Sequence, residues 1–392
     1  MKPDAWYKGT VSLARENIEL TFNVPHDVFS TLQIDEGTLA LLDHLPTSKP
    51  SLILDMGCGY GALGLPVAAL NMEAEVHMVD RDLLAVEWAG RNAENNVLAN
   101  TEIYGSLGFR DLRHGKRLFD WILCNVPARI GDRFIEDLFV SGNALLASGG
   151  EIRVVVIRDL GPTVEKIGEE NKLPIELIHR GPRHIVYALK KSGVAKASAD
   201  ADSQRLYQRD RISVGGVEFD RPYDISGDSI RVEKALPILI DGMPKREQGD
   251  VLCVRSSYGI LPILSRVRWP GSRVKTFDRD LLATTFTREN AARLDLMNPQ
   301  LEIEDAVDLH LYAANKKTRF DLITVEVSAS VGRAVVEDEL ALVMELLKPG
   351  AQALLLCGDR LAKEVLEPFA KRKKVSLYTL ITRNSMSLLR MS

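Results

Sequence analysis

The sequence is most informative at residues 54–64, which read Leu54-Asp55-Met56-Gly57-Cys58-Gly59-Tyr60-Gly61-Ala62-Leu63-Gly64. An apolar run typical of a buried strand, Ser51 to Leu54, leads into this stretch, and a run typical of a helix, Leu63 to Leu70, follows it. Glycines between a strand and a helix allow a tight turn and let a ligand approach the backbone closely. The stretch therefore predicts a strand, a glycine-rich turn and a helix, with a ligand at the turn.

The type of ligand can be narrowed from the acidic residues around the glycines. Gly59, Gly61 and Gly64 match the GxGxxG pattern of dinucleotide sites. Asp55 argues against a dinucleotide, because a carboxylate there would repel a pyrophosphate but attract an ammonium group. Asp80 ends the next expected strand, where an acidic side chain can accept both ribose hydroxyls. A ribose with a cationic amino-acid tail describes S-adenosylmethionine, so we expect this cofactor. A dehydrogenase that binds a dinucleotide is a much weaker interpretation of the same motif.

Short apolar runs alternate with amphipathic ones through the first half of the chain. Further strands are expected at Val76 to Val79, Trp121 to Cys124 and Ile152 to Ile157, and further helices at Leu83 to Asn95 and Phe134 to Leu146. This alternation predicts an α/β fold, a mostly parallel sheet with helices on both faces. Such sheets bind ligands at the carboxyl ends of their strands.

The chain also repeats itself. Asp80-Arg81-Asp82-Leu83-Leu84-Ala85 recurs 198 residues later as Asp278-Arg279-Asp280-Leu281-Leu282-Ala283. Tyr60-Gly61 and Asn92-Ala93 recur at the same offset, and later matches such as Phe119-Asp120 recur at 201 residues. We therefore predict two tandem Rossmann-like domains, residues 1–192 and 211–392, joined by a polar linker at 193–210.

The second copy has lost the residues that suggest a cofactor. Gly57 and Gly59 correspond to Arg255 and Ser257, Asp55 to Cys253 and Asn125 to Glu326. Arg255 would place a cation and a bulky side chain where the methionine part of the cofactor should lie. We expect the second domain to be degenerate and to serve in RNA docking.

The fourth expected strand runs into Asn125-Val126-Pro127-Ala128. Methyltransferases acting on planar nitrogens carry Asn-Pro-Pro-aromatic at this position. A purine exocyclic amine is a poor nucleophile, and accepting its two hydrogens on the Asn125 side-chain oxygen and the next backbone carbonyl would aim its lone pair at a sulfonium methyl group. This chemistry needs no metal. The alternative is that Asn125 only closes a turn.

Together these residues resemble the bacterial ribosomal RNA guanine-N2 methyltransferases of the methyltransferase small family. The resemblance extends to Asn23 to Ser30, Asp35 to Leu42, Gly149 to Val155 and Gly181 to Ala188, and covers about residues 15–190. Two departures matter. The working copy comes first here and second in those enzymes, and Asn-Val-Pro-Ala lacks the first proline and the aromatic residue.

The resemblance implies S-adenosylmethionine as cofactor and RNA, most favourably guanine N2 of ribosomal RNA, as substrate. A small molecule or a protein glutamine as acceptor, and a non-catalytic RNA-binding protein, remain alternatives. The implied catalytic residues are Asn125, Val126 and Pro127. The implied cofactor contacts are Asp55, Gly57, Cys58, Gly59, Gly61, Asp80, Arg81, Ser106 and Asn125, and the substrate contacts are Phe29, Ala128 and Arg153. Phe29 could stack on a flipped base in place of the missing aromatic residue.

Composition sets the remaining limits. Residues 1–195 hold 20 Lys and Arg against 26 Asp and Glu, and residues 196–392 hold 30 against 28. RNA contacts must therefore come from local patches, and the second half is the better place to look. Candidates there are Arg266, Arg268, Arg273 and the run Lys371-Arg372-Lys373-Lys374, which could equally be solvated surface charges.

Cysteine spacing and hydropathy bear on the compartment. Four cysteines lie far apart and suggest no zinc site, the first residues lack the apolar core of a signal peptide, and no apolar run reaches the length of a membrane span. We expect a cytoplasmic protein without metal or membrane contact, for which a monomer is one possibility.

Overall fold

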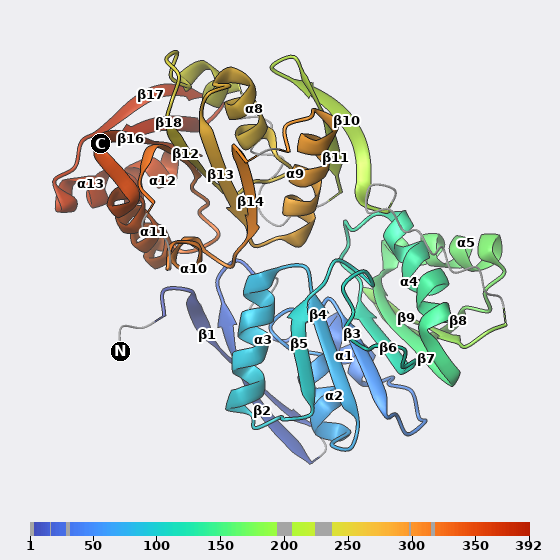
Figure 1. The fold of residues 1–392 in the computed structure, drawn as a ribbon. Coiled ribbons are helices and arrows are strands. Elements are labelled where there is room, and N and C mark those ends of the chain that lie inside the picture. Colours follow the sequence, from blue (N-terminus) through green and yellow to red (C-terminus); the bar gives the residue numbers. More distant parts are fainter. Residues whose placement is uncertain are drawn as a thin grey trace. The chain divides into compact units, whose positions relative to one another are not determined.

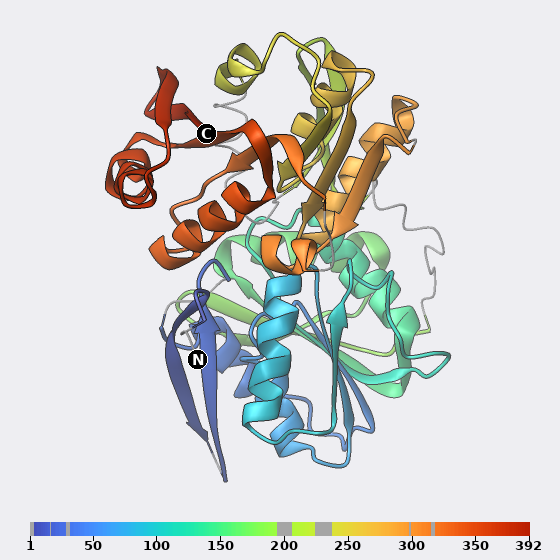
Figure 2. The same cartoon turned by 60° about the vertical axis from the view of Figure 1, so that its left-hand side comes forward.

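A computed structural model describes residues 4–15, 17–28, 32–193, 206–223, 237–297, 299–314 and 318–392. The chain divides into two compact units (Figures 1 and 2). The first unit is Lys8–Arg209, and the second unit combines Met1–Tyr7 with Asp210–Ser392. Phe29 and most of the expected linker lie outside the described residues.

The first unit is built on a seven-stranded sheet with the order β5-β4-β3-β6-β7-β9-β8. Its strands are β3 (Leu52–Met56), β4 (Glu75–Asp80), β5 (Thr101–Gly105), β6 (Phe119–Asn125), β7 (Leu146–Ile157), β8 (Glu176–Arg180) and β9 (His184–Lys190). The first five of these run parallel, and β9 is antiparallel to both β7 and β8. Helices pack on both faces of the sheet (Figure 1), so β3, an interior strand between β4 and β6, is buried along its whole length.

The helices of the first unit are α1 (Glu36–Leu42), α2 (Gly64–Leu70), α3 (Leu83–Asn95), α4 (Asp132–Leu145) and α5 (Gly161–Asn171), with a short 3₁₀ turn at Arg158–Leu160. A separate two-stranded sheet, β1 (Tyr7–Arg15) with β2 (Ile18–Pro25), precedes α1. The expected helices at 63–70, 83–95 and 134–146 are present within two residues of their predicted ends, because apolar periodicity fixes which residues face the sheet.

The second unit repeats this plan. Its seven-stranded sheet has the order β14-β13-β12-β15-β16-β18-β17, and β10 (Gln208–Val214) pairs with β11 (Val217–Pro222). The sheet strands are β12 (Asp250–Val254), β13 (Arg273–Asp278), β14 (Leu301–Asp305), β15 (Phe320–Glu326), β16 (Leu347–Gly358), β17 (Leu377–Arg383) and β18 (Met386–Met391). The helices are α8 (Ile260–Arg268), α9 (Leu281–Arg293), α10 (Leu309–Ala313), α11 (Arg333–Leu346), α12 (Asp359–Leu361) and α13 (Glu367–Lys373), with a π-helical turn at Ala362–Leu366.

One strand order in two units confirms the prediction of tandem Rossmann-like domains. Residues that recur in the sequence make equivalent hydrogen bonds in the two units. Asn92 on α3 donates to the backbone oxygens of Tyr60 and Asn23 at 2.9 and 3.0 Å, and accepts from the Asn23 N–H at 2.8 Å. The second unit repeats these three bonds with Asn290, Tyr258 and Asp220.

The chain's first residues belong to the second unit, which the repeat does not indicate. The Trp6 indole N–H donates to Asp308 at 3.2 Å, and the Arg279 guanidinium lies 5.5 Å from the centre of the Trp6 ring. Ala5 and Trp6 also pack against the core beneath β12 and β15. None of the helices in the described ranges is long and apolar enough to cross a membrane.

Candidate functional site

The glycine turn between β3 and α2 has the backbone that its sequence predicts. Gly57, Gly59 and Gly61 all have positive φ, at 80°, 56° and 100°. A Cβ at Gly57 or Gly59 would meet no atom within 4 Å, whereas a Cβ at Gly61 would lie 2.7 Å from Leu65. The turn is therefore packed against α2 at one glycine and open at the other two. That open backbone is a cradle on which a ligand can lie.

Two residues at the end of β4 fix this turn, Val79 through its backbone oxygen and Asp80 through its side chain. The Gly57 and Cys58 N–H groups donate to the Val79 oxygen at 2.8 and 2.9 Å. Asp80 accepts from the Gly59 N–H at 2.9 Å through one oxygen and from the Asp82 N–H at 2.9 Å through the other. The half-buried Asp80 carboxylate is thus held beside the open glycines.

Asp55, at the end of β3, is a buried carboxylate whose oxygens have no hydrogen-bond partner of normal geometry in the described part of the chain, and the nearby Gly64 N–H only partly offsets the rise in its pKa. Burial, and secondarily the negative charge of Asp80, raise the pKa of Asp55 to about 7. A Cβ at Gly64 would come within 2.6 Å of the Asp55 side chain, so the third glycine of the pattern makes room for this carboxylate. Because both oxygens are covered, Asp55 acts on a nearby cation through its charge, not through an exposed contact.

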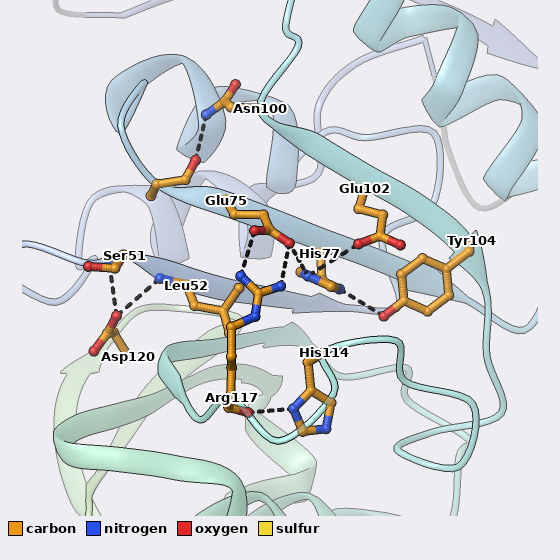
Figure 3. Close-up of polar contacts among 11 residues, drawn as sticks. Ser51, Leu52, Glu75, His77, Asn100, Glu102, Tyr104, His114, Arg117 and Asp120 are labelled. Atoms are coloured by element: carbon orange, nitrogen blue, oxygen red, sulfur yellow. Dashed lines mark hydrogen bonds and ion pairs between the residues drawn. The ribbon is translucent and has the colours of Figure 1, made fainter.

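Carboxylates at the opposite edge of the same sheet are satisfied within the protein. Glu75, at the start of β4, receives two hydrogen bonds of 2.7 Å from Arg117, and Asp120 accepts from the Ser51 and Leu52 N–H groups (Figure 3). The hydrogen bond from Arg117 is the main reason that the pKa of Glu75 falls to about 2. Glu75 and Asp120 thus have hydrogen-bond partners within the protein, whereas the Asp55 carboxylate at the carboxyl edge has none of normal geometry in the described residues.

A metal site at this opposite edge is not needed to explain its residues. Glu75, His77 and Glu102 place potential ligand atoms within 4.8 Å of one another. Both ring nitrogens of buried His77 are already bonded, to Glu75 at 2.8 Å and Tyr104 at 2.9 Å, and Arg117 covers both oxygens of Glu75 (Figure 3). We read the cluster as a structural network across β4 and β5.

Asn125, at the end of β6, has a fixed amide. Its Nδ2 donates to the Asp35 carboxylate and to the Thr38 hydroxyl, both at 3.0 Å. Both amide hydrogens are used, so the side-chain oxygen is the group left to accept a hydrogen bond. Val126 is buried, with its N–H donating to the Val155 oxygen at 2.9 Å, while Pro127 and Ala128 are exposed.

Two other expected contacts are used internally. Ser106 is buried, and its hydroxyl donates to the Gly108 oxygen at 2.7 Å and accepts from the Asp111 N–H at 3.2 Å, which closes the turn after β5. Arg153 is also buried, donating to Glu151 at 2.7 Å and to the His44 oxygen. Its guanidinium therefore serves the interior, and the expectation that Arg153 contacts substrate is not supported by this placement.

Two further expected cofactor contacts are Cys58, which lies within the glycine turn between Gly57 and Gly59, and Arg81, which follows β4. Arg81 follows Asp80 and is partly buried. Burial raises the pKa of the Cys58 thiol well above its ordinary value, so the thiol stays protonated. Cys58 would then meet a ligand through its backbone.

In the second unit, the side chain of Arg255 occupies the position that corresponds to the glycine turn. Arg255 and Ser257 adopt the positive φ of the glycines they replace, at 66° and 51°. The Arg255 guanidinium donates to the Glu326 oxygen at 2.6 Å and to the Glu339 carboxylate at 3.1 Å. An internal cation thus spans from the turn to the residue that corresponds to Asn125, as expected for a copy without a cofactor.

The predicted basic RNA contacts divide into internal and exposed groups. Arg266 is buried and donates to the backbone oxygens of Trp269, Pro270 and Ser272, so its interpretation as an RNA contact is wrong. Arg268 donates to backbone oxygens, and Arg273 pairs with Asp250. Lys371, Lys373 and Lys374 at the end of α13 are exposed, as is Arg372, which pairs with Glu337 at 2.6 Å.

Known proteins resemble the first unit in sequence. Residues 19–171 match the model of the methyltransferase small domain. An uncharacterised protein of Bacillus subtilis, YbxB, is 34% identical over 167 residues, which are 41% of this chain and 82% of that protein. The ribosomal RNA large subunit methyltransferase G of Aliivibrio fischeri is 34% identical over 177 residues, which span 41% of this chain and 44% of that one.

A solved structure resembles the whole chain in fold. The T. thermophilus 16S rRNA N2 methyltransferase, solved in complex with AdoMet and guanosine, superposes over 98% of both chains with a TM-score of 0.64. The two sequences are 18% identical. The likeness therefore establishes the tandem fold and nothing finer.

The buried Asp55 carboxylate predicts an unusual pH dependence of stability. Its folded pKa, about 7, lies above its ordinary value of 3.8, so the folded state loses stability as pH rises through this window. Asp55→Asn should therefore stabilise the ligand-free chain at about pH 8, and the gain should shrink towards about pH 5. Urea unfolding of the full chain at both pH values measures this.

Glu75→Gln is the matched control. The pKa of Glu75 is lowered to about 2, so its charge stabilises the fold at both pH values and its removal should destabilise at both. A destabilising effect of Asp55→Asn at high pH would contradict the reading of Asp55 as an unpaired charge.

Proposed function

Because the chain belongs to the methyltransferase small domain family, we propose that its first unit transfers a methyl group from S-adenosylmethionine to an exocyclic nitrogen of RNA, guanine N2 of ribosomal RNA being the favoured acceptor. One observation carries this proposal. Asn125 stands at the carboxyl edge of the sheet with both amide hydrogens engaged and its oxygen available. This arrangement suits an acceptor that donates hydrogens, as an amine does.

The glycine turn fits the cofactor. The backbone at Gly57 and Gly59 is open, Asp80 stands beside it to accept ribose hydroxyls, and the unpaired charge of Asp55 favours a cationic ligand. S-adenosylmethionine, when bound, supplies an electrophilic methyl group on a sulfonium. The fixed positions of Asp80 and the turn mean that little has to reorganise before the ligand binds.

Asn125 and Val126 then position the acceptor. The Asn125 side-chain oxygen and the Val126 backbone oxygen accept the two amine hydrogens, which orients the nitrogen lone pair towards the methyl group. The nitrogen lone pair would form the new bond to the methyl carbon as the sulfur–methyl bond breaks. The electron pair of that bond would stay on sulfur, leaving a neutral thioether, and the methylated nitrogen would lose one proton to solvent. Pro127 and Ala128, both exposed, form the rim beside it, and Phe29 stays a prediction for base stacking.

Ribosomal RNA is proposed as substrate for two reasons. The A. fischeri relative is named as a ribosomal RNA methyltransferase, and the T. thermophilus protein of the same fold as a 16S rRNA N2 methyltransferase. The second unit also carries three exposed lysines, Lys371, Lys373 and Lys374, which could contact phosphates. The first half of the chain has a net negative charge and supplies such contacts poorly. With this substrate we expect the protein to act in the cytoplasm.

Cofactor binding is expected at one site per chain. Asp80→Ala should weaken S-adenosylmethionine binding by roughly 1.5–3 kcal/mol, because two charge-assisted hydrogen bonds to ribose are lost. Isothermal titration calorimetry gives both the stoichiometry and the affinity. Asp278→Ala is the control, since Asp278 holds the corresponding turn of the second unit through the Ser257 N–H at 3.1 Å. Two sites per chain, or equal losses in both variants, would rule out the assignment.

Methyl transfer should depend on Asn125. Asn125→Ala should lower kcat by about a hundredfold or more and should weaken cofactor binding far less, because the main role of the side-chain oxygen is to orient the acceptor. Transfer of a radiolabelled methyl group to total RNA from a strain lacking the gene measures this. A variant as active as the wild type would leave Asn125 as a turn residue and refute the proposal.

RNA binding should depend on the end of α13. Replacing Lys371, Lys373 and Lys374 with Gln should weaken RNA binding across sequences and reduce the salt dependence by a slope of about three, as the loss of phosphate contacts does. Filter binding over a range of salt concentrations measures both quantities. Lys172→Gln is the control, because Lys172 caps α5 in the same left-handed conformation as Lys374 caps α13. Unchanged binding in the triple variant would exclude this surface.

A further inference from the structure

The amide of Asn125 is held in one of its two orientations by residues 87 and 90 positions away in the sequence. Nδ2 lies 3.0 Å from the Thr38 hydroxyl and 3.0 Å from the Asp35 carboxylate. A half-turn of the amide would bring its oxygen against the carboxylate oxygen and leave both oxygens without a hydrogen between them. The carboxylate therefore selects the orientation in which Nδ2 faces α1 and the oxygen faces away.

The group that makes this selection is itself fixed. The Asp35 oxygen that accepts from Asn125 also accepts from the Gly37 N–H at 2.9 Å and the Thr38 N–H at 3.2 Å, and so caps α1. A Cβ at Gly37 would come within 2.8 Å of this oxygen, so glycine is needed for the carboxylate to enter. Thr38 is 5% exposed, which holds its hydroxyl in place.

We propose that Asp35 and Thr38 are positioning residues for methyl transfer, and that they set the specificity of the site for an amine. This inference rests on the proposed function. Asn125 with its oxygen outward accepts hydrogen bonds and suits an NH₂ group, whereas the opposite orientation would present two donors and suit a carbonyl oxygen. A guanine carries both groups on its ring, so the orientation of Asn125 decides which of them is bound productively.

The test separates this role from a purely structural one by removing the hydroxyl alone. Thr38→Val keeps the shape of the side chain but leaves one amide hydrogen of Asn125 without its acceptor. We expect kcat for methyl transfer to RNA to fall by about five- to tenfold, since one hydrogen bond no longer holds the amide. The affinity for S-adenosylmethionine and the melting temperature should stay close to those of the wild type. Thr38→Ser, which keeps the hydroxyl, should restore kcat.

The orientation of the amide can also be observed directly. In the full chain labelled with ¹⁵N-asparagine, the side-chain NH₂ signals of Asn125 are identified by their loss in Asn125→Ala. We expect one of the two hydrogens to shift and to exchange faster in Thr38→Val, and neither to change in Thr38→Ser. Thr38→Ala is the second variant if Thr38→Val does not fold, with the same expected loss of kcat.

Two failures are distinguishable. If the wild type methylates RNA and a folded Thr38→Val or Thr38→Ala variant has the same kcat, or if Thr38→Ser loses as much as they do, the positioning role is overturned. If the wild type transfers no methyl group to RNA, the proposed function fails, and the NMR comparison still decides whether Thr38 holds the amide.

Discussion

Parallel strands bring their carboxyl ends to one edge of a sheet, and the first unit places three polar side chains at that edge. Asp55, Asp80 and Asn125 end three neighbouring strands, β3, β4 and β6. Asp55 is buried without a partner and Asn125 has an oxygen left to accept, while at the opposite edge Glu75 is fully paired with Arg117 (Figure 3). A buried charge without a partner costs stability, so its presence beneath an open glycine turn points to a ligand that supplies the missing cation.

The two copies separate what the fold requires from what the chemistry requires. Asn92 and Asn290 make the same three backbone hydrogen bonds, which tie α3 and α9 to the segments before them. In contrast to these conserved bonds, the turns after β3 and β12 carry different residues in the two units. Where the first unit has glycines over an orphaned Asp55, the second has Arg255 bonded to Glu339 and Cys253 in place of the aspartate. In the second unit, an ion pair between Arg255 and Glu339 therefore stands at the turn that is open in the first unit.

Sequence reasoning predicts β3, β4, β6 and β7, the glycine turn and the duplication, because apolar periodicity and glycine are local signals, but it assigns no strand at β1, β2, β5 or β8. It assigned Arg153 and Arg266 to RNA because no local pattern shows that Glu151 and the backbone oxygens around Trp269 take up those guanidiniums. Asp35 and Thr38 lie in a stretch that resembles the family, but the sequence does not mark them as site residues, because their hydrogen bonds to Asn125 join positions 90 and 87 residues apart. The packing of Trp6 on the second unit likewise joins residues about 300 positions apart, which periodicity cannot show.

The central claim is that the carboxyl edge of the first sheet methylates an exocyclic amine of RNA. Its most direct test is the chemical identity of the product. Ribosomal RNA from a strain lacking the gene is incubated with the purified full chain and S-adenosylmethionine bearing a deuterated methyl group, digested to nucleosides and analysed by mass spectrometry. The account predicts deuterated N2-methylguanosine, formed far more slowly when Asn125 is replaced by alanine. A label found only on ribose, on a ring carbon or on protein would contradict it.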